Sequence, residues 1–185
     1  MSLLVSLLLQ FAVLAKNTYQ GAGFSFHYPD AWSVLKSESD WQGDNVILGA
    51  GGLDADGLPH EGLMVSLVTE RKKLRVADPA GQVLRVKRKL AFDEIVRRVR
   101  RGQQRNHPDV TQLKGTEGRW TVKGRMALYK DWLKAGRGGG LRGRDVFIDD
   151  PQGVIVLSFV APESDFEEKV PILWQILASL EFAGS

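Results

Sequence analysis

The feature of this 185-residue sequence that most constrains its fold is the order of two kinds of hydrophobic periodicity. Residues 24–28 alternate aromatic and polar side chains, which predicts a half-buried strand, and the apolar run of residues 63–68 predicts a buried one. A helical pattern follows, then a series of strand-like stretches, and a second helical pattern near the end. Because strands and helices do not alternate regularly, this order favours an α+β fold with a mainly antiparallel sheet over a βαβ fold.

The first helical pattern has apolar residues on one face only. They recur at the i, i+3, i+4, i+7 spacing of an amphipathic helix: Phe92, Ile95, Val96 and Val99. We expect a helix over about residues 91–105, ending before Pro108 because proline disfavours helix at and before its position.

The second helical pattern predicts a helix over about residues 163–178. Ser164 and Glu167 have the spacing of a capping box, and Pro171 lies inside the pattern. Its buried face should consist of Phe166, Val170, Leu173, Trp174 and Leu177.

Glycine and proline predict the connectors between the strands. Residues 49–62 and the glycine-rich segment 136–143 have loop composition. Strand-like stretches occupy residues 110–117, 119–133, 141–149 and 153–160. Together with the two helices, they predict an α/β/α sandwich, a mainly antiparallel sheet flanked by helices.

Length and composition predict one domain. We expect residues 16–185 to form it, because a chain of this size can bury a complete core and the sequence contains no cysteine for disulfides or thiolate ligands. Residues 1–15 are a hydrophobic segment, interpreted as a signal peptide or as a first apolar element of the fold. Their apolar run is shorter than the roughly 20 residues that span a membrane, and no basic residue precedes it.

The net charge of +3 conceals a strongly basic middle of the chain. Residues 71–144 contain 22 basic and 6 acidic side chains, whereas the segments before and after them are acidic. This block predicts either an interface for an anionic partner or a solvated face balanced by the acidic segments. The candidate partner-binding residues are Arg97, Arg98 and Arg101 on the first helix, with Arg71, Lys72, Lys73 and Arg88 just before it.

No motif predicts catalysis, a cofactor or a metal. His27, His60 and His107 are far apart, and no metal-binding histidine motif occurs. Residues 54–57 have the opening of a calcium loop but lack its downstream ligands, so an ordinary turn is the better interpretation. The nucleophile-elbow and phosphate-loop motifs are also absent from the sequence.

Two segments carry a resemblance to a known family. The run Gly23 to Trp32, GFSFHYPDAW, is similar to the opening strand and turn of the PsbP-like superfamily. Leu157 to Pro162, Phe166 and residues 177–182 resemble its closing strand, helix and last strand. The superfamily also contains the Ran-binding nuclear import factor and bacterial DcrB-type periplasmic proteins. The resemblance implies an antiparallel sheet between helices and no catalytic machinery, and it transfers no functional residues.

These observations predict a non-enzymatic, exported binding or assembly-accessory protein that engages a protein or a membrane-associated complex. The alternative is a binder of nucleic acid or another anionic polymer through residues 71–144, and we rank nucleic acid below a protein partner. An anionic surface is a third candidate, and no integral membrane protein is expected. Localisation would be periplasmic or extracellular if the leader is a signal peptide, and cytoplasmic otherwise.

Overall fold

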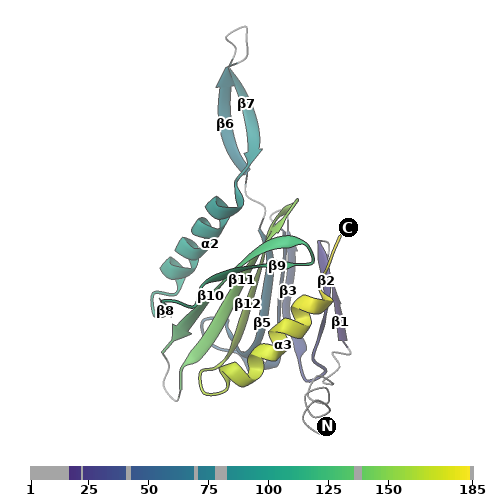
Figure 1. The fold of residues 1–185 in the computed structure, drawn as a ribbon, viewed down its shortest axis with the longest axis vertical. Helices are drawn as coiled ribbons and strands as arrows, with labels where there is room; N and C mark the ends of the chain where they lie inside the picture. The colour runs from purple at the N-terminus through teal and green to yellow at the C-terminus, as the bar shows by residue number, and fades with distance from the viewer. Residues whose placement is uncertain are drawn as a thin grey trace, which may run out of the picture.

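The fold is built on one large antiparallel sheet (Figure 1). The computed structural model describes residues 17–21, 23–40, 43–68, 71–77, 83–135 and 139–183; in residues 39–40, 43–44, 71–77 and 83–89 it describes the backbone alone. The sheet order is β3-β4-β5-β12-β11-β10-β8, and β9 also pairs with β10. The strands are β3 Ser33–Asp40, β4 Gly43–Leu53, β5 Pro59–Val68, β8 Val110–Gln112, β9 Gly118–Val122, β10 Arg125–Lys134, β11 Leu141–Asp150 and β12 Gly153–Pro162. All the pairings are antiparallel, as predicted.

Two smaller sheets complete the described strands. β1 (Asn17–Gln20), β2 (Phe24–Tyr28) and β13 (Glu181–Phe182) form a three-stranded sheet that joins the two ends of the domain. β6 (Arg71–Ala77) and β7 (Val83–Lys89) pair only with each other, between β5 and α2 in the chain. The alternation at residues 24–28 therefore predicted a strand correctly, whereas a hairpin at residues 71–89 was not predicted.

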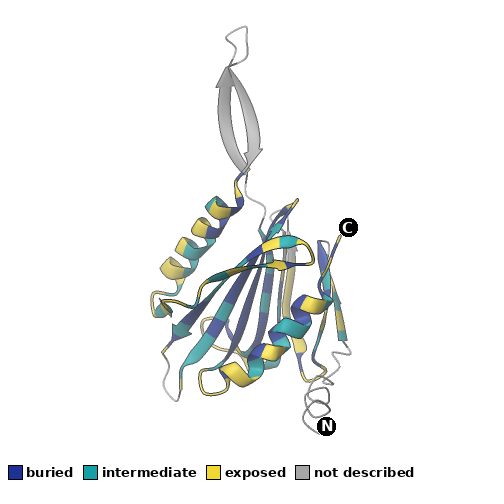
Figure 2. Ribbon diagram, viewed as in Figure 1, coloured by how far each residue is buried: buried dark blue, intermediate teal, exposed yellow. Residues whose placement is uncertain are grey.

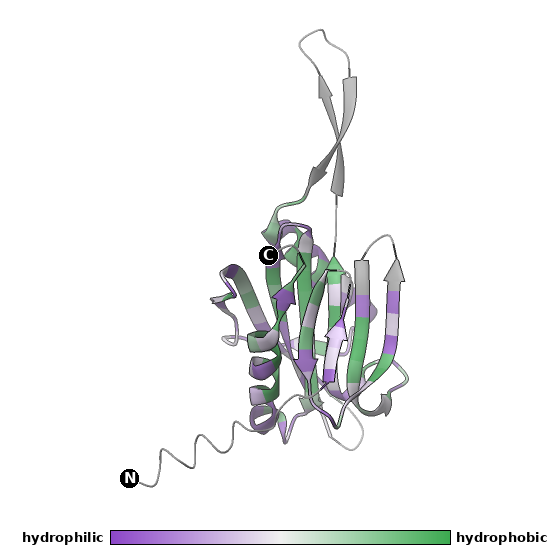
Figure 3. Cartoon of the chain, turned by 90° about the vertical axis from the view of Figure 1, so that its right-hand side faces the viewer, coloured by the Kyte–Doolittle hydropathy of each residue, from purple (hydrophilic) through white to green (hydrophobic). Residues whose placement is uncertain are grey.

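The helices α2 (Phe92–Asn106) and α3 (Phe166–Ser179) cover opposite faces of the large sheet. Alternate residues of β12 divide between them: Val154 and Val156 pack in the cluster of α2, while Ile155 and Leu157 pack in the cluster of α3. Side chains alternate across a strand, so the two clusters lie on different faces. Figure 2 shows the buried strands between the helices, and Figure 3 shows hydrophobic residues gathered on them. This is the predicted α+β sandwich.

The predicted strand 119–133 is in fact a hairpin. β9 and β10 are joined at Lys123 and Gly124, whose φ angles are 48° and 79°. Positive φ at both positions fits the two-residue turn whose twist matches antiparallel strands. A turn of two residues does not interrupt an alternating pattern, so the sequence resembled one long strand.

The predicted loop 49–62 was largely wrong, because β4 and β5 fill it except for residues 54–58. Gly49 lies opposite Gly62 in the two strands. A Cβ at Gly62 would overlap the carbonyl oxygen of Leu48, so the glycine permits close strand approach. The predicted connector 136–143 was also too long, since β11 begins at Leu141.

Both helices have nearly the predicted bounds, with two corrections at α3. The helix begins at Phe166 with Asp165 at its N-cap, and Ser164 donates its hydroxyl hydrogen bond to the Asp165 carboxylate instead of capping the helix. Trp174 is half-buried, and its ring meets Trp120 of β9 edge-on with centroids 4.4 Å apart. Residues 1–15 lie outside the described residues.

Candidate functional site

The outer side of α2 carries a row of arginines, called here the arginine face: Arg97, Arg98, Arg101 and Arg105. All four are exposed, while Phe92, Ile95 and Val96 on the other side of the helix are buried. The yellow outer and dark inner surfaces of α2 in Figure 2 show this division. The helical periodicity of the sequence predicted it, because residues three and four apart share a face. The same periodicity predicted Arg100 on the outer face, which was wrong, because Arg100 is half-buried and its guanidinium lies over the Phe147 ring.

The arginine face has little compensating charge of its own. Glu94 pairs with Arg98 at 3.3 Å between Oε1 and Nη2. Within the described residues, Arg97, Arg101 and Arg105 form no ion pair with a carboxylate. Together with Glu94 and Gln104, the four arginines line a shallow surface depression. The result is a concentrated positive potential on one side of the helix.

The other four candidate residues lie on the hairpin that precedes α2. Arg71, Lys72 and Lys73 belong to β6, and Arg88 belongs to β7. The register places Lys72 opposite Arg88, and basic residues also face Arg71 and Lys73 across the hairpin. The side chains of these residues lie outside the described part of the chain. A continuous surface shared with α2 therefore stays a prediction.

The inner side of α2 contributes to a cavity of about 260 Å3 against the sheet. Val99 and Gln103 reach it from α2 and His107 from the C-cap of that helix, and most of the other walls come from the strands. Those further lining residues are Leu58, Met64, Ser66, Val68, Val110, Gln112, Trp132, Asp145, Val156 and Ser158. This cavity, called here the α2 cavity, is mostly apolar with polar groups concentrated around Asp145.

Asp145 is a carboxyl group in a nearly dry position, with 1% of its surface exposed. Its Oδ1 accepts hydrogen bonds from Trp132 Nε1 at 3.0 Å and Ser158 Oγ at 2.7 Å, and its Oδ2 accepts one from Gln103 Nε2 at 3.2 Å. Burial raises the pKa of Asp145, and the three hydrogen bonds and the charge of Arg100 oppose that shift. The sequence did not predict that Asp145 is buried or that it accepts these hydrogen bonds.

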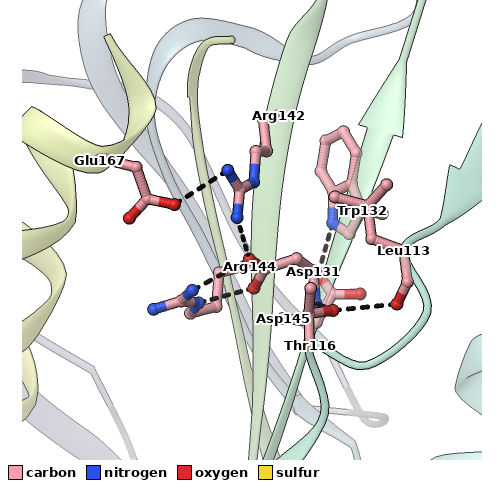
Figure 4. Close-up of polar contacts among 8 residues, drawn as sticks. All are labelled: Leu113, Thr116, Asp131, Trp132, Arg142, Arg144, Asp145 and Glu167. Carbon is pink, nitrogen blue, oxygen red and sulfur yellow. Dashed lines mark hydrogen bonds and ion pairs between the residues drawn. The ribbon is translucent and has the colours of Figure 1, made fainter.

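A second buried carboxylate, Asp131, faces α3 on the opposite side of the sheet (Figure 4). Arg144 donates to it through Nε at 2.6 Å and Nη2 at 2.9 Å, and Arg142 donates through Nη2 at 2.7 Å. Arg142 also pairs with Glu167 of α3 at 2.9 Å. The hydrogen bonds to Asp131 raise the pKa of Arg144. This cluster ties α3 to the sheet and uses all its charges internally.

The Asp54–Asp56 turn is held by the chain itself. Asp54 Oδ1 accepts hydrogen bonds from the backbone N–H groups of Asp56 and Leu58. The buried Lys134 ammonium donates to Asp54 Oδ2 at 3.3 Å and to Asp56. Burial lowers the pKa of Lys134, but the hydrogen bonds to both carboxylates outweigh it and the net shift is upward. An internal cation thus occupies the position between the two acids, and no group of three metal-ligating side chains occurs among the described residues.

Comparison with known proteins identifies the fold. No protein-family model matches the sequence, and no curated protein matches it. Among solved structures, cyanobacterial PsbP from Synechocystis sp. PCC 6803 is similar with a TM-score of 0.56 at 11% identity, over 92% of this chain and 95% of that one. A protein from Bacteroides thetaiotaomicron is similar with a TM-score of 0.50 at 12% identity, over 93% of this chain and 50% of that one.

A third structure, LpqN of Mycobacterium tuberculosis, described as involved in cell envelope biogenesis, has a TM-score of 0.48 at 14% identity, over 89% of this chain and 86% of that one. The similarity to cyanobacterial PsbP shows that the chain has the PsbP-like fold, as its two end segments implied. None of the helices in the described part of the chain is long and apolar enough to cross a membrane.

Proposed function

We propose that the chain is a non-enzymatic accessory protein that binds an acidic protein partner through the arginine face of α2. The observation that carries the proposal is the exposure of four arginines on one side of a helix whose other side is anchored in the core. Arginine guanidinium groups bind carboxylates with two parallel hydrogen bonds, so a fixed row of them is suited to an acidic surface.

A binding role also agrees with how the buried titratable groups are used. Asp131 and Lys134 form ion pairs with other residues of the same chain. Ser158 donates its hydroxyl directly to Asp145, and the His107 ring makes no hydrogen bond to either residue. A serine nucleophile would need an imidazole base between the hydroxyl and the carboxylate. These contacts favour a structural role for the polar groups over a catalytic one.

The dimensions of the arginine face favour an acidic protein over nucleic acid. From Arg97 to Arg105 the helix rises about 12 Å, at 1.5 Å per residue. A protein segment with a few carboxylates matches that length, whereas nucleic-acid binders track several phosphates along the backbone. The alternative function, nucleic-acid binding, would need the basic side chains of the β6–β7 hairpin as well.

We further propose export from the cytoplasm, on the basis of the apolar run at residues 3–15. The test is N-terminal sequencing of the protein isolated from its native host. A mature chain beginning near Lys16 is expected. A chain that retains Met1 would contradict cleavage of a signal peptide.

The binding proposal is tested by reversing the charge of Arg97, Arg98 and Arg101 to Glu. The matched control reverses Lys114, Arg119 and Lys123, which are exposed and lie outside α2. Both variants change the net charge equally, so a general charge effect would weaken them alike. Immobilised poly-glutamate serves as the acidic protein probe and a DNA duplex as the alternative probe.

We expect the α2 variant to lose binding to poly-glutamate while the control keeps most of it. Both variants should unfold within about 1 kcal/mol of the wild type, because exposed charges contribute little to stability. A photo-crosslinker at Gln104 in native cells would then capture the partner. Equal loss in the two variants would contradict a specific arginine face, and tighter binding to DNA with a steep salt dependence would favour the alternative.

A further inference from the structure

We propose that the α2 cavity is a binding site for a small primary amine with an apolar body, whose ammonium group lies against Asp145. This inference does not depend on the proposed function, because the cavity lies on the inner side of α2 and the arginine face on the outer side. It rests on the shape of the cavity and on the hydrogen-bonding groups left open in it.

The walls of the cavity select an apolar body. Six of the residues that line it have aliphatic or thioether side chains: Leu58, Met64, Val68, Val99, Val110 and Val156. The volume of about 260 Å3 exceeds the roughly 150 Å3 of an apolar protein cavity that takes up benzene. A single aromatic ring with a short side chain therefore fits the space.

Two acceptor atoms at the polar end of the cavity are left open. All three hydrogen bonds to Asp145 come from neutral groups, namely an indole, a hydroxyl and an amide. The carbonyl oxygens Oε1 of Gln103 and Gln112 are buried without a hydrogen-bond partner. Both glutamines line the cavity, and an unsatisfied buried acceptor is costly. A ligand that supplies donors would remove that cost.

The orientation of Gln103 is fixed by its neighbour. Its Nε2 faces the Asp145 carboxylate at 3.2 Å, so rotating the amide would bring two acceptors together. The Oε1 atom is therefore held away from Asp145 Oδ2 and stays available. Gln112 belongs to β8, opposite Trp132 of β10, whose indole also donates to Asp145. One open Oε1 atom thus belongs to Gln103, which donates to Asp145, and the other belongs to Gln112, beside Trp132, which also donates to Asp145.

A primary ammonium group fits this arrangement better than a neutral donor. It has three N–H donors and no acceptor, so it adds no unmet lone pair of its own. It also supplies the positive charge that a buried carboxylate needs, and hydrogen bonds between ionised groups are the strong ones. The Arg100 guanidinium acts on Asp145 through space, but it lies over the Phe147 ring at 5.1 Å and makes no hydrogen bond to Asp145.

The experiment compares phenethylamine with phenethyl alcohol, which has the same body and a neutral head group. Binding to the folded wild-type protein is measured by calorimetry near neutral pH and located by amide and indole NMR shifts. Asp145→Asn removes the charge and keeps one acceptor oxygen for Trp132 and Ser158, which both donate to Oδ1 of Asp145. Val99→Phe fills the cavity from α2. Glu181→Gln, which removes an exposed carboxylate on β13, is the control for charge.

We expect one phenethylamine per chain, with shifts at Gln103, Gln112 and the Trp132 indole. The Asp145→Asn variant should bind about 10- to 100-fold more weakly, as should the alcohol to the wild type, the range expected for one charge-assisted hydrogen bond. Val99→Phe should also bind more weakly, because its ring takes up the space of the apolar body. Glu181→Gln should bind like the wild type. Equal binding of amine and alcohol, shifts outside the cavity, or no binding of the amine would overturn the proposal. If Asp145→Asn does not fold, Val99→Phe and the amine–alcohol comparison decide the result.

Discussion

Replacing Asp131 by Asn should destabilise the protein far more than a surface charge change would. The Asp131 carboxylate is fully buried and accepts three N–H bonds from Arg142 and Arg144 (Figure 4). The arginine side chains are only 21% and 12% exposed. Asparagine keeps one acceptor oxygen, but its NH2 group points at guanidinium donors. Two positive charges would then remain in a poorly hydrated site with no buried carboxylate between them.

The magnitude follows from what each arginine retains. Removing one partner of a buried ion pair costs about 3–5 kcal/mol. Arg142 keeps its ion pair with Glu167, and its guanidinium lies 4.5 Å from the centre of the Phe166 ring. We therefore expect the lower end, about 3 kcal/mol in the free energy of unfolding.

Urea unfolding, followed by circular dichroism and tryptophan fluorescence, measures this loss. With a slope of about 2 kcal/mol/M, the midpoint should fall by roughly 1.5 M with no change in slope. The control is Lys36→Ala, which removes an exposed pair with Glu38 and should cost less than about 1 kcal/mol. A loss in Asp131→Asn as small as in this control would refute the reasoning, because it would show that the arginines are solvated without their carboxylate.

Two further perturbations test the α2 side of the sheet. Gly143→Ala should lower the free energy of unfolding, measured by thermal unfolding, by about 1–3 kcal/mol, because a Cβ there would overlap the Trp132 ring. Gly102→Ala should raise it by up to about 1 kcal/mol, because Gly102 has open space around it in α2. Equal effects of the two substitutions would contradict both packing arguments. The raised pKa of Asp145 means that its contribution to stability is present below the unfolded pKa of about 4 and is lost as pH rises through the folded pKa. The urea midpoint of the wild type should therefore fall relative to that of Asp145→Asn as the pH rises above about 4, and a difference that stays constant with pH would contradict the shift.

The sequence predicted the elements whose signal is local. Apolar spacing in residues 92–99 and 166–177 predicted both helices and their buried faces, apart from the half-buried Val99 and Trp174, because a 3.6-residue period is set within one segment. The predicted strand boundaries were wrong where glycines in residues 49–62 were interpreted as a loop. At Gly49 and Gly62 the glycines serve close strand packing instead, and only the pairing of the two strands reveals that reason.

The same distinction separates the two sides of α2. The outward position of Arg97 and Arg101 follows from helix geometry alone, so it could be predicted. The α2 cavity could not, because Trp132, Ser158 and Gln112 come together only through the order of β8, β10, β11 and β12 in the sheet. A lone acidic residue in a strand, such as Asp145, was the available sequence signal, but its burial depends on which face that strand position presents.

Two buried carboxylates on neighbouring strands thus have different consequences. The register pairs Asp131 with Arg144, and the two are bonded on the α3 side of the sheet. It pairs Asp145 with Lys130 on the α2 side, but the Lys130 ammonium pairs with Glu117 instead. Asp131 is neutralised by two guanidinium groups, and its hydrogen bonds hold the sheet to α3. Asp145 is held by neutral donors only, beside two open amide oxygens. Each carboxylate accepts three hydrogen bonds, but the charge of Asp131 is already neutralised within the fold, so of the two Asp145 is the one whose charge a bound cation would neutralise.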